Sequence, residues 1–349
     1  MQTLTRLGRW ALAAGAIALA GAAFAQATPA DPNVQQQRER VRTQPGNNAP
    51  VWREVRKEAQ EHYTSVKGRE TGVLVQSAGE TWRQIRNGPV TFYGGWLLVL
   101  CVVVIAAIYF GQGPIKVHEK PTGRRLPRFS TAERWAHWTM GISFCVLGVT
   151  GLIVLFGKHV LLPVIGYTLF SWLSALSKNL HNFVAPLFIA SLLVFIVMYA
   201  RDNLPQKGDG AWLATAWRMF VGGEQPASGR FNAGEKVWFW IGVVLMCLLV
   251  SVSGLVLLFP NFDQVRATMQ LAHIVHVITA ILIIGYALAH IYMGTIGVEG
   301  AYENMRDGTT DEAWAREHHR LWYDEVSKGS AGAPVGGAVP AGAPHSKQD

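Results

Sequence analysis

The sequence predicts an all-α integral membrane protein, built as a bundle of about five transmembrane helices. Half of its 349 residues are hydrophobic and only 15% are charged, whereas a soluble protein usually carries about 25% charged residues. Five apolar segments each approach the ~20 residues that a spanning helix needs; they run over 94–111, 135–156, 181–200, 237–259 and 270–294. Aromatic residues gather near the segment ends, as in a membrane-interface belt: Tyr93, Trp96, Tyr109, Trp135, Trp138, Trp238 and Trp240.

The N-terminus has the features of a secretory signal peptide. Arg6 and Arg9 precede the apolar run "WALAAGAIALAGAAFA", which ends in a small-residue cleavage pattern. We therefore predict a signal peptide over 1–25; an uncleaved anchor is the alternative, and either one exports the segment that follows. Residues 26–93 are polar and contain no catalytic motif, so we expect an exported periplasmic segment.

The charge distribution predicts the orientation. With an exported N-terminus, the 112–134 and 201–236 loops are cytoplasmic, and basic residues gather in these two loops. Such a positive-inside bias explains the net charge of +8 without a nucleic-acid partner. We expect a multi-pass protein of the bacterial inner membrane with a cytoplasmic C-terminal tail over 295–329 and a disordered, low-complexity end over 330–349. The predicted outer loops hold only Lys158, Lys178 and Arg266.

The three cysteines, Cys101, Cys145 and Cys247, each lie in an apolar run, and neither CxxC nor CxxCH occurs. This pattern argues against a zinc ribbon, an iron–sulfur cluster or a covalently attached c-type haem. We expect all three to be buried and to behave as small apolar side chains.

Four histidines lie within the predicted spans at two matched depths. His137 and His290 lie near the cytoplasmic surface, whereas His181 opens the third span on the outer side and His276 lies one to two turns into the fifth span from that side. Ionisable residues inside a span are costly, so they are candidates for a functional site.

Helix geometry places His276 and His290 on one face. Fourteen residues separate them, which corresponds to ~21 Å along the helix and ~40° around it. Gly151 follows His137 by the same fourteen residues, so it faces the outer level, where a glycine would leave room for a flat macrocycle. Gly254 in the fourth span could do the same. His273 lies ~60° away from His276.

Two bis-imidazole sites stacked across a membrane are what two b-type haems require, and two strong axial ligands favour electron transfer over oxygen chemistry. We therefore predict a di-haem cytochrome b core of four helices over 135–294. The alternatives are separate hydrogen bonds between helices and a proton relay, for which the spans lack Asp and Glu. We assign His273 to a polar contact near the helix start or to a propionate contact. The adjacent His318 and His319 could suggest a metal site, but neighbouring side chains on a helix diverge by ~100° and cannot easily share one ion. We therefore expect these two histidines to form a polar surface.

Several separated motifs resemble the membrane cytochrome b (gamma) subunit of respiratory formate dehydrogenase. They are "RFSTAERWAHWTMGISFCVLGVTGLIVLF", "KNLHNFVAPLF", "GRFNAGEKVWFW" and "LAHIYMGTIGVEGAYENMRDGTTDEAWAREHHRLWY", and together they cover roughly 125–328. The stretch "TGVLVQSAGETWRQIRNGPV" and the first span are similar to the longer versions of that subunit. Each motif alone is weak, since hydrogenase and thiosulfate reductase cytochromes b share the general layout.

The resemblance implies specific ligands. His137 and His290 would hold the cytoplasmic-side haem, and His181 and His276 the periplasmic-side haem. A quinone pocket near the inner haem would include Asn232, Glu235 and His290. Family members carry Gln at the position of Glu235, which leaves its role open between quinone binding and a proton path. Asn232 is equally suited to be the N-cap of the fourth span.

The function implied by the resemblance is that of an electron-transfer subunit of formate:quinone oxidoreductase. A catalytic (alpha) subunit with molybdenum or tungsten would oxidise formate, an iron–sulfur (beta) subunit would pass the electrons on, and two b haems would carry them to the quinone pool. The nearest alternative is a hydrogenase or thiosulfate reductase partner. A haem-free membrane anchor or transporter is the alternative of another class; broken Gly- and Pro-rich spans would favour a transporter, but only Pro186 interrupts a predicted span.

Overall fold

The computed structural model describes residues 78–221 and 226–331. The predicted signal peptide, most of the predicted exported segment and the low-complexity C-terminal end lie outside the described residues. Five helical stretches of the described part are long and apolar enough to cross a bilayer, which confirms the predicted all-α membrane architecture. They run over Gly79–Gln112, Thr131–Val160, Leu162–Tyr199, Ala233–Leu258 and Arg266–Gly297.

The first stretch is longer than the sequence predicts. It joins α4 (Gly79–Ile85), a π-helical turn η1 (Arg86–Val90) and α5 (Thr91–Gln112). Gly88 departs from helical φ/ψ and Pro89 lacks an N–H, so the helix is distorted at this point. Residues 79–93, expected within the polar exported segment, are therefore helical and extend the first span.

The second and third stretches form a hairpin of α6 (Thr131–Val160) and α7 (Leu162–Tyr199). Ser130 begins α6 with a capping box, in which its side chain accepts from the Glu133 N–H and the Glu133 carboxylate accepts from the Ser130 N–H. The prediction that the third span begins at 181 is wrong, because α7 begins at Leu162, is interrupted at Gly166 (φ 74°) and carries His181 inside it. The missed beginning is itself largely apolar, but the polar run Ser177-Lys178-Asn179 separates it from the rest of the helix in the sequence. Consequently Lys158 and Lys178 lie in helices and not in loops.

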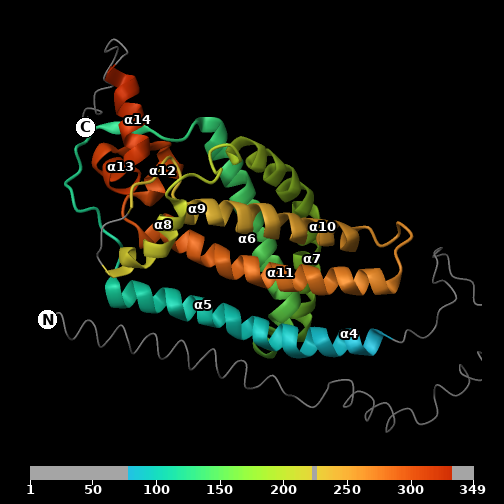
Figure 1. The fold of residues 1–349 in the computed structure, drawn as a ribbon. Helices are drawn as coiled ribbons and strands as arrows, with labels where there is room; N and C mark the ends of the chain where they lie inside the picture. Colours follow the sequence, from blue (N-terminus) through green and yellow to red (C-terminus); the bar gives the residue numbers. More distant parts are fainter. Residues whose placement is uncertain (1–77, 222–225, 332–349) are drawn as a thin grey trace, which may run out of the picture.

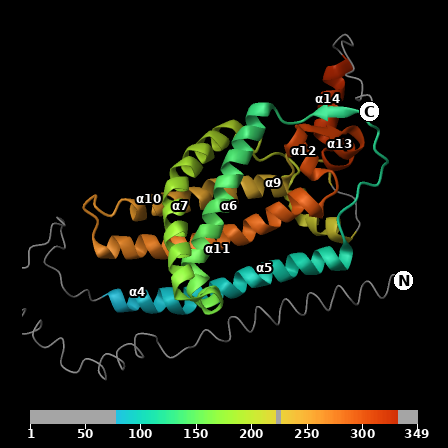
Figure 2. The ribbon, with the colours of Figure 1, turned by 180° about the vertical axis from the view of Figure 1, so that it is seen from behind.

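The remaining stretches lie beside the first. The fourth consists of α9 (Ala233–Val237), a π-helix η3 (Trp238–Cys247) and α10 (Leu248–Leu258). The fifth consists of α11 (Arg266–Tyr292) and a π-helical end, η4 (Met293–Gly297). Helix α11 packs between α5 and α10, and the α6–α7 hairpin crosses these helices (Figures 1 and 2).

The main core fills the space between the hairpin and the fourth and fifth stretches. Its buried side chains include Leu192 and Phe195 of α7, Phe239 and Val243 of η3, and Ile283 of α11. These contacts fix the relative positions of the helices that carry the spanning histidines.

The C-terminal segment folds against one end of the bundle, which we name the tail end; the opposite end, beside α4 and the α10–α11 connection, is the far end (Figure 1). At the tail end, strands β1 (Arg125–Pro127) and β2 (Thr309–Asp311) pair antiparallel, with Leu126 opposite Thr310. The C-terminal segment also contains α12 (Ala301–Asp307), α13 (Glu312–His318) and α14 (Arg320–Ala331). The connection between α7 and α9 contains α8 (Asp209–Thr215) and the 3₁₀ helix η2 (Ala216–Val221).

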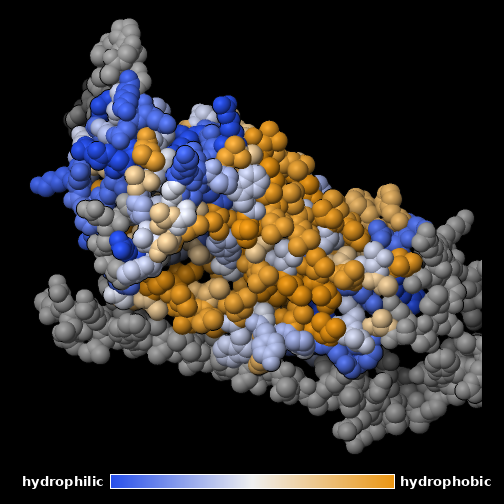
Figure 3. All heavy atoms as spheres, in the orientation of Figure 1, coloured by the Kyte–Doolittle hydropathy of each residue, from blue (hydrophilic) through white to orange (hydrophobic). Residues whose placement is uncertain are grey.

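The bundle presents an apolar surface between two more polar ends. Hydrophobic residues cover the helices, and hydrophilic residues gather over the tail end (Figure 3). Phe183 and Val197 of α7 are 83% and 80% exposed, as side chains that face lipid would be. The three cysteines are unpaired. The prediction that all three are buried is confirmed for Cys247 and wrong for the others: Cys101 is half-buried, and Cys145 is exposed on α6 within this apolar surface.

Candidate functional site

The structure brings the four spanning histidines together in two pairs. At the tail end, the ring centres of His137 on α6 and His290 on α11 are 6.3 Å apart. Toward the far end, the ring centres of His181 on α7 and His276 on α11 are 6.2 Å apart. Helix α11 contributes one histidine to each pair. His276 and His290 are fourteen residues apart, and a rise of ~1.5 Å per residue therefore spaces the pairs by ~21 Å along the helix axis.

Both separations suit one metal ion held between two imidazoles. A metal–imidazole bond of ~2.0–2.1 Å, with a further ~1.2 Å from nitrogen to ring centre, predicts ring centres ~6.4 Å apart across an ion. No group of three or more His, Cys, Asp or Glu side chains in the described residues could hold an ion. Each pair could instead hold the iron of a haem through its two imidazoles.

Hydrogen bonds donated by Nδ1 orient both rings of the far pair. Nδ1 of His276 donates to the carbonyl oxygen of Val250 at 2.9 Å. Nδ1 of His181 lies 3.0 Å from Oγ1 of Thr150, whose hydroxyl donates to the Val146 carbonyl and therefore accepts from the imidazole. Both rings thus keep Nε2 unprotonated, which is the arrangement typical of metal-bound histidine.

Glycines allow these two rings to lie close to neighbouring helices. A Cβ at Gly151 would lie 3.4 Å from Cε1 of His181, and a Cβ at Gly254 would lie 3.1 Å from Cε1 of His276. Both glycines therefore lie at the outer level where the sequence analysis expects them. They border the imidazole rings themselves, so larger side chains would crowd these rings.

The tail pair lies among aromatic rings. His290 stacks on Trp238, with ring centres 4.7 Å apart and planes 9° from parallel, and the ring centre of His137 is 6.1 Å from that of Phe195. Nδ1 of His137 is buried and has no hydrogen-bond partner among the described residues. An unpaired buried polar atom is costly, so the described part of the chain leaves this site incomplete, which fits a pocket for a bound group.

The third histidine of α11, His273, belongs to neither pair. Its ring makes an edge contact with Trp82 of α4, with ring centres 5.4 Å apart. The structure thus separates His273 from the two positions that face partner imidazoles.

Asn232 and Glu235 form a capping box at the start of α9. The Asn232 side chain accepts from the Glu235 N–H at 2.9 Å, and the Glu235 carboxylate accepts from the Asn232 N–H at 2.7 Å. Asn232 is therefore the N-cap of this helix, one of the two roles that its sequence position allows; the other is a contact with quinone. Trp238 follows Glu235 by three residues on the same helical stretch and stacks on His290, so this segment links the carboxylate to the tail pair.

The cap of α9 repeats the cap of α6, and the two are cross-linked. The sequence Arg-Phe-Ser-x-x-Glu begins at Arg128 and Arg-Phe-Asn-x-x-Glu begins at Arg230. Nη2 of each arginine donates to the backbone oxygen of the other, at 2.8 and 2.7 Å. Arg128 also contacts Glu235 at 3.4 Å, and Arg230 contacts Glu133 at 2.7 Å. We call this reciprocal arrangement the arginine clamp; it ties the starts of α6 and α9 together.

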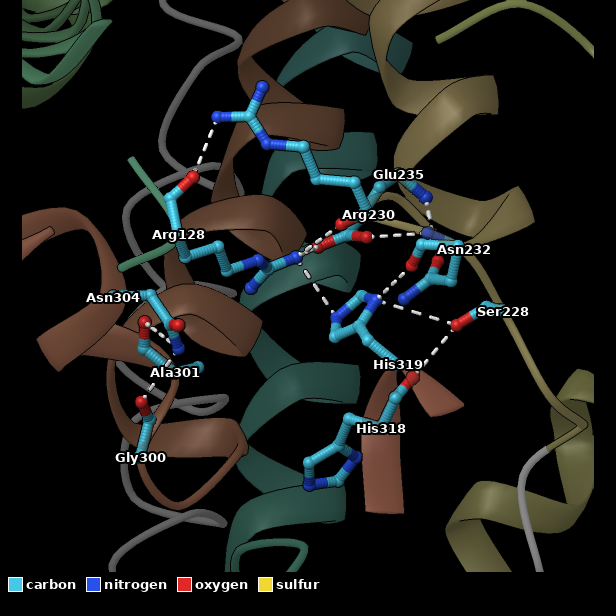
Figure 4. A network of polar contacts seen from close by, with 11 residues as sticks. Arg128, Ser228, Arg230, Asn232, Glu235, Gly300, Ala301, Asn304, His318 and His319 are labelled. Atoms are coloured by element: carbon cyan, nitrogen blue, oxygen red, sulfur yellow. Dashed lines mark hydrogen bonds and ion pairs between the residues drawn. The ribbon is translucent and has the colours of Figure 1, made fainter. Parts of the chain in front are cut away.

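His319 holds the clamp from the C-terminal segment (Figure 4). Its Nδ1 donates to the Gly229 carbonyl at 2.8 Å, and its Nε2 accepts from Nη2 of Arg128 at 3.0 Å. Burial, reinforced by the charge of Arg128, holds the pKa of His319 well below its usual value. The prediction that His318 and His319 form a polar surface is wrong: they are 4% and 1% exposed. Their neighbours come from distant segments, which local helix geometry does not reveal.

Sequence reasoning missed Arg128, Arg230 and His319 as residues around the candidate site. One local signal was present for the two arginines, because each directly precedes a Phe and a capping residue in a repeated pattern. No comparable signal marks His319.

Comparison with known proteins matches residues 128–306, about half of the chain, to the family described as prokaryotic cytochrome b561. The chain belongs to this cytochrome b family. It is 30% identical over 209 residues to the formate dehydrogenase cytochrome b556(fdo) subunit of Escherichia coli, across 58% of this chain and 93% of the relative. It is 27% identical over 218 residues to the nitrate-inducible cytochrome b556(Fdn) subunit of the same species, across 60% of this chain and 94% of the relative.

A further relative is the formate dehydrogenase cytochrome b556 subunit of Haemophilus influenzae, 26% identical over 212 residues, across 58% of this chain and 83% of the relative. These matches support a formate dehydrogenase cytochrome b subunit, as the sequence motifs indicate. The family implies haem b as the cofactor of a multi-pass membrane protein. Helices α4 and α5 lie outside the matched family region.

Proposed function

We propose that this chain carries electrons from an iron–sulfur partner at the far end to quinone near the tail end. The observation that carries this proposal is the presence of two facing imidazole pairs, with ring centres 6.3 and 6.2 Å apart, both served by α11. When bound there, each b haem would supply a one-electron carrier suited to electron transfer.

In this proposal His137 and His290 hold the tail-end haem, and His181 and His276 hold the far-end haem. The anchored Nδ1 atoms of His181 and His276 support the assignment, because they leave Nε2 of each ring unprotonated and able to bind a metal. The close helix contacts at Gly151 and Gly254 keep those two rings in position.

The proposed orientation places the far end in the periplasm and the tail end in the cytoplasm of a bacterial inner membrane. Basic residues of the α5–α6 connection, such as Lys116 and Arg124, lie at the tail end, as the positive-inside rule requires. The periplasmic iron–sulfur (beta) subunit would dock at the far end and receive electrons from a catalytic (alpha) subunit that holds molybdenum or tungsten.

Quinone would bind at the tail end beside Asn232, Glu235 and His290. Two observations support this position. The Glu235 side chain remains 38% exposed although it faces Arg128, and Trp238 of the same segment stacks on His290. In this role Glu235 delivers a proton from the cytoplasmic side to the reduced quinone. Protons are then consumed on the side opposite to formate oxidation, which builds a membrane potential.

The test of this function uses the complex recovered through an affinity tag on this chain. We expect formate to increase the reduced b-haem absorbance of the complex and to reduce added quinone, whereas the separated chain should respond only to chemical reductants. Hydrogen serves as the control donor, and thiosulfate serves as a control acceptor for the reduced haems. Reduction by hydrogen, or oxidation by thiosulfate, without any response to formate would assign the chain to another respiratory complex.

A further inference from the structure

The first helical stretch docks tightly on the helix that carries two of the paired histidines. A Cβ at Gly285 of α11 would lie 3.2 Å from Sγ of Cys101 on α5, and a Cβ at Gly94 of α5 would overlap the Ile281 side chain of α11. The region shared with the cytochrome b family begins only at residue 128. A segment outside that region is therefore positioned to contribute residues to the far end of the core.

At the far end, α4 places Trp82 against His273. Their ring centres are 5.4 Å apart in an edge contact. Nε1 of Trp82 and Nδ1 of His273 are both buried, and neither has a hydrogen-bond partner within the described residues. Two such atoms in one contact point to a missing acceptor, because buried polar groups are normally satisfied.

The chemistry of these groups selects an anion. An indole N–H can only donate, and a ring nitrogen of His273 can also donate. Arg86 follows Trp82 by four residues on the same helical stretch, which places the two side chains on one face. Nη1 of Arg86 donates to Oδ1 of Asn87 at 2.7 Å, which uses one of the five N–H groups of the guanidinium. Two unfilled donors and a guanidinium on the same helical stretch suit a carboxylate or phosphate oxygen.

The position of the cluster favours a carboxylate from inside the protein. His273 precedes the paired His276 by three residues on α11, so it lies ~4.5 Å nearer the far end along the helix. Haem carries two propionate carboxylates on one edge of the macrocycle. A haem between His181 and His276 would thus lie within one helical turn of the cluster.

We infer that Trp82, Arg86 and His273 form a binding site for a haem propionate carboxylate at the far end. This inference rests on the proposed function, since it requires a haem between His181 and His276. The consequence is that the additional first helix completes the far-end cofactor site and influences its redox potential.

A redox titration of both b haems in the purified complex tests the inference. A nearby positive charge disfavours ferric haem, so Arg86→Gln should lower the midpoint potential of one haem and leave the other unchanged. Arg86→Lys, which keeps the charge, should restore most of the potential. Arg83→Gln is the matched control, because Arg83 lies on the same stretch and pairs with Glu80 at the surface; it should change neither potential.

Trp82→Phe tests the donor separately. It keeps Arg86 and the aromatic contact with His273 but removes the indole N–H, and it remains informative if Arg86→Gln does not assemble. We expect a smaller fall in potential at the same haem.

Unchanged potentials in both Arg86→Gln and Trp82→Phe, with the haem content retained, would overturn the inference. Loss of tightly bound phospholipid phosphate with unchanged potentials would overturn it too, and would identify a lipid headgroup as the occupant. Absence of haem from the unmodified complex would instead refute the proposed function itself.

Discussion

Asn232 and Glu235 show how a single residue can have a structural role and a proposed chemical role together. Both complete the cap of α9 through hydrogen bonds of 2.9 and 2.7 Å. A loss of activity on substitution is therefore ambiguous unless the cap is preserved. The repeated cap at α6 offers a control, because Glu133 has the same backbone role and pairs with Arg230 as Glu235 pairs with Arg128.

We predict that Glu235→Gln lowers the rate of quinone reduction by ~10²–10⁴, the usual contribution of a general acid or base. Gln preserves a capping box, so haem reduction by formate should continue. Glu133→Gln should leave quinone reduction near the unmodified rate. The measurement compares quinone reduction with haem reduction in the same complex. Equal losses in the two variants would show that Glu235 acts only through structure.

At the residue scale, the sequence predicts the paired histidines better than their surroundings. His276 and His290 could be assigned to one face because helix periodicity relates residues fourteen apart. The contact between His319 and Arg128 joins residues 191 positions apart, and no local pattern encodes such a contact. The buried network around the tail end therefore became visible only in the folded chain.

At the scale of elements, the arginine clamp and His319 join three segments at the tail end. They are the start of α6, the start of α9 and the junction of α13 with α14 (Figure 4). Because His319 donates from Nδ1 and accepts at Nε2, it makes both hydrogen bonds only in its neutral form. Protonation of its ring would place a second cation against Arg128.

We predict that acid loosens the C-terminal helices. Burial lowers the pKa of His318 to about 4, against the influence of Glu317, and the pKa of His319 is also depressed. Unfolded histidines bind protons near pH ~6.5, so the folded segment is most stable above that pH and loses stability as the pH falls toward the folded values.

Amide hydrogen exchange of residues 312–331 at pH 7.5 and 5.5, corrected for intrinsic rates, measures this change. Protection should fall at the lower pH, and His319→Gln should reduce the difference. The neighbouring Arg320→Gln variant, altered at an exposed ion pair, should retain it. Equal protection at both pH values in the unmodified chain would contradict the prediction.

The errors at the element scale share one cause. The apolar parts of all five spans were visible in the sequence, but the beginnings of the first and third stretches were not. Residues 79–93 and 162–180 are helical except at Gly88 and Gly166, although they include polar residues. Polar residues beside an apolar run therefore do not mark the end of the helix.

At the scale of the whole molecule, α11 connects the two histidine pairs. It contributes to both histidine pairs, packs against α5 and α10, and carries His273 beside α4. The ~21 Å between its two paired histidines separates the proposed partner side from the proposed quinone side. The central claim is therefore that each pair holds one b haem.

The most direct test is a reduced-minus-oxidised spectrum with a pyridine haemochrome count. It is made on the unmodified chain and on the variants His276→Ala, His137→Ala and His273→Ala. We predict two b haems per chain, loss of one in each of the first two variants, and retention of both in His273→Ala. Two haems that persist in His276→Ala, or well-folded unmodified chain without haem, would contradict the account.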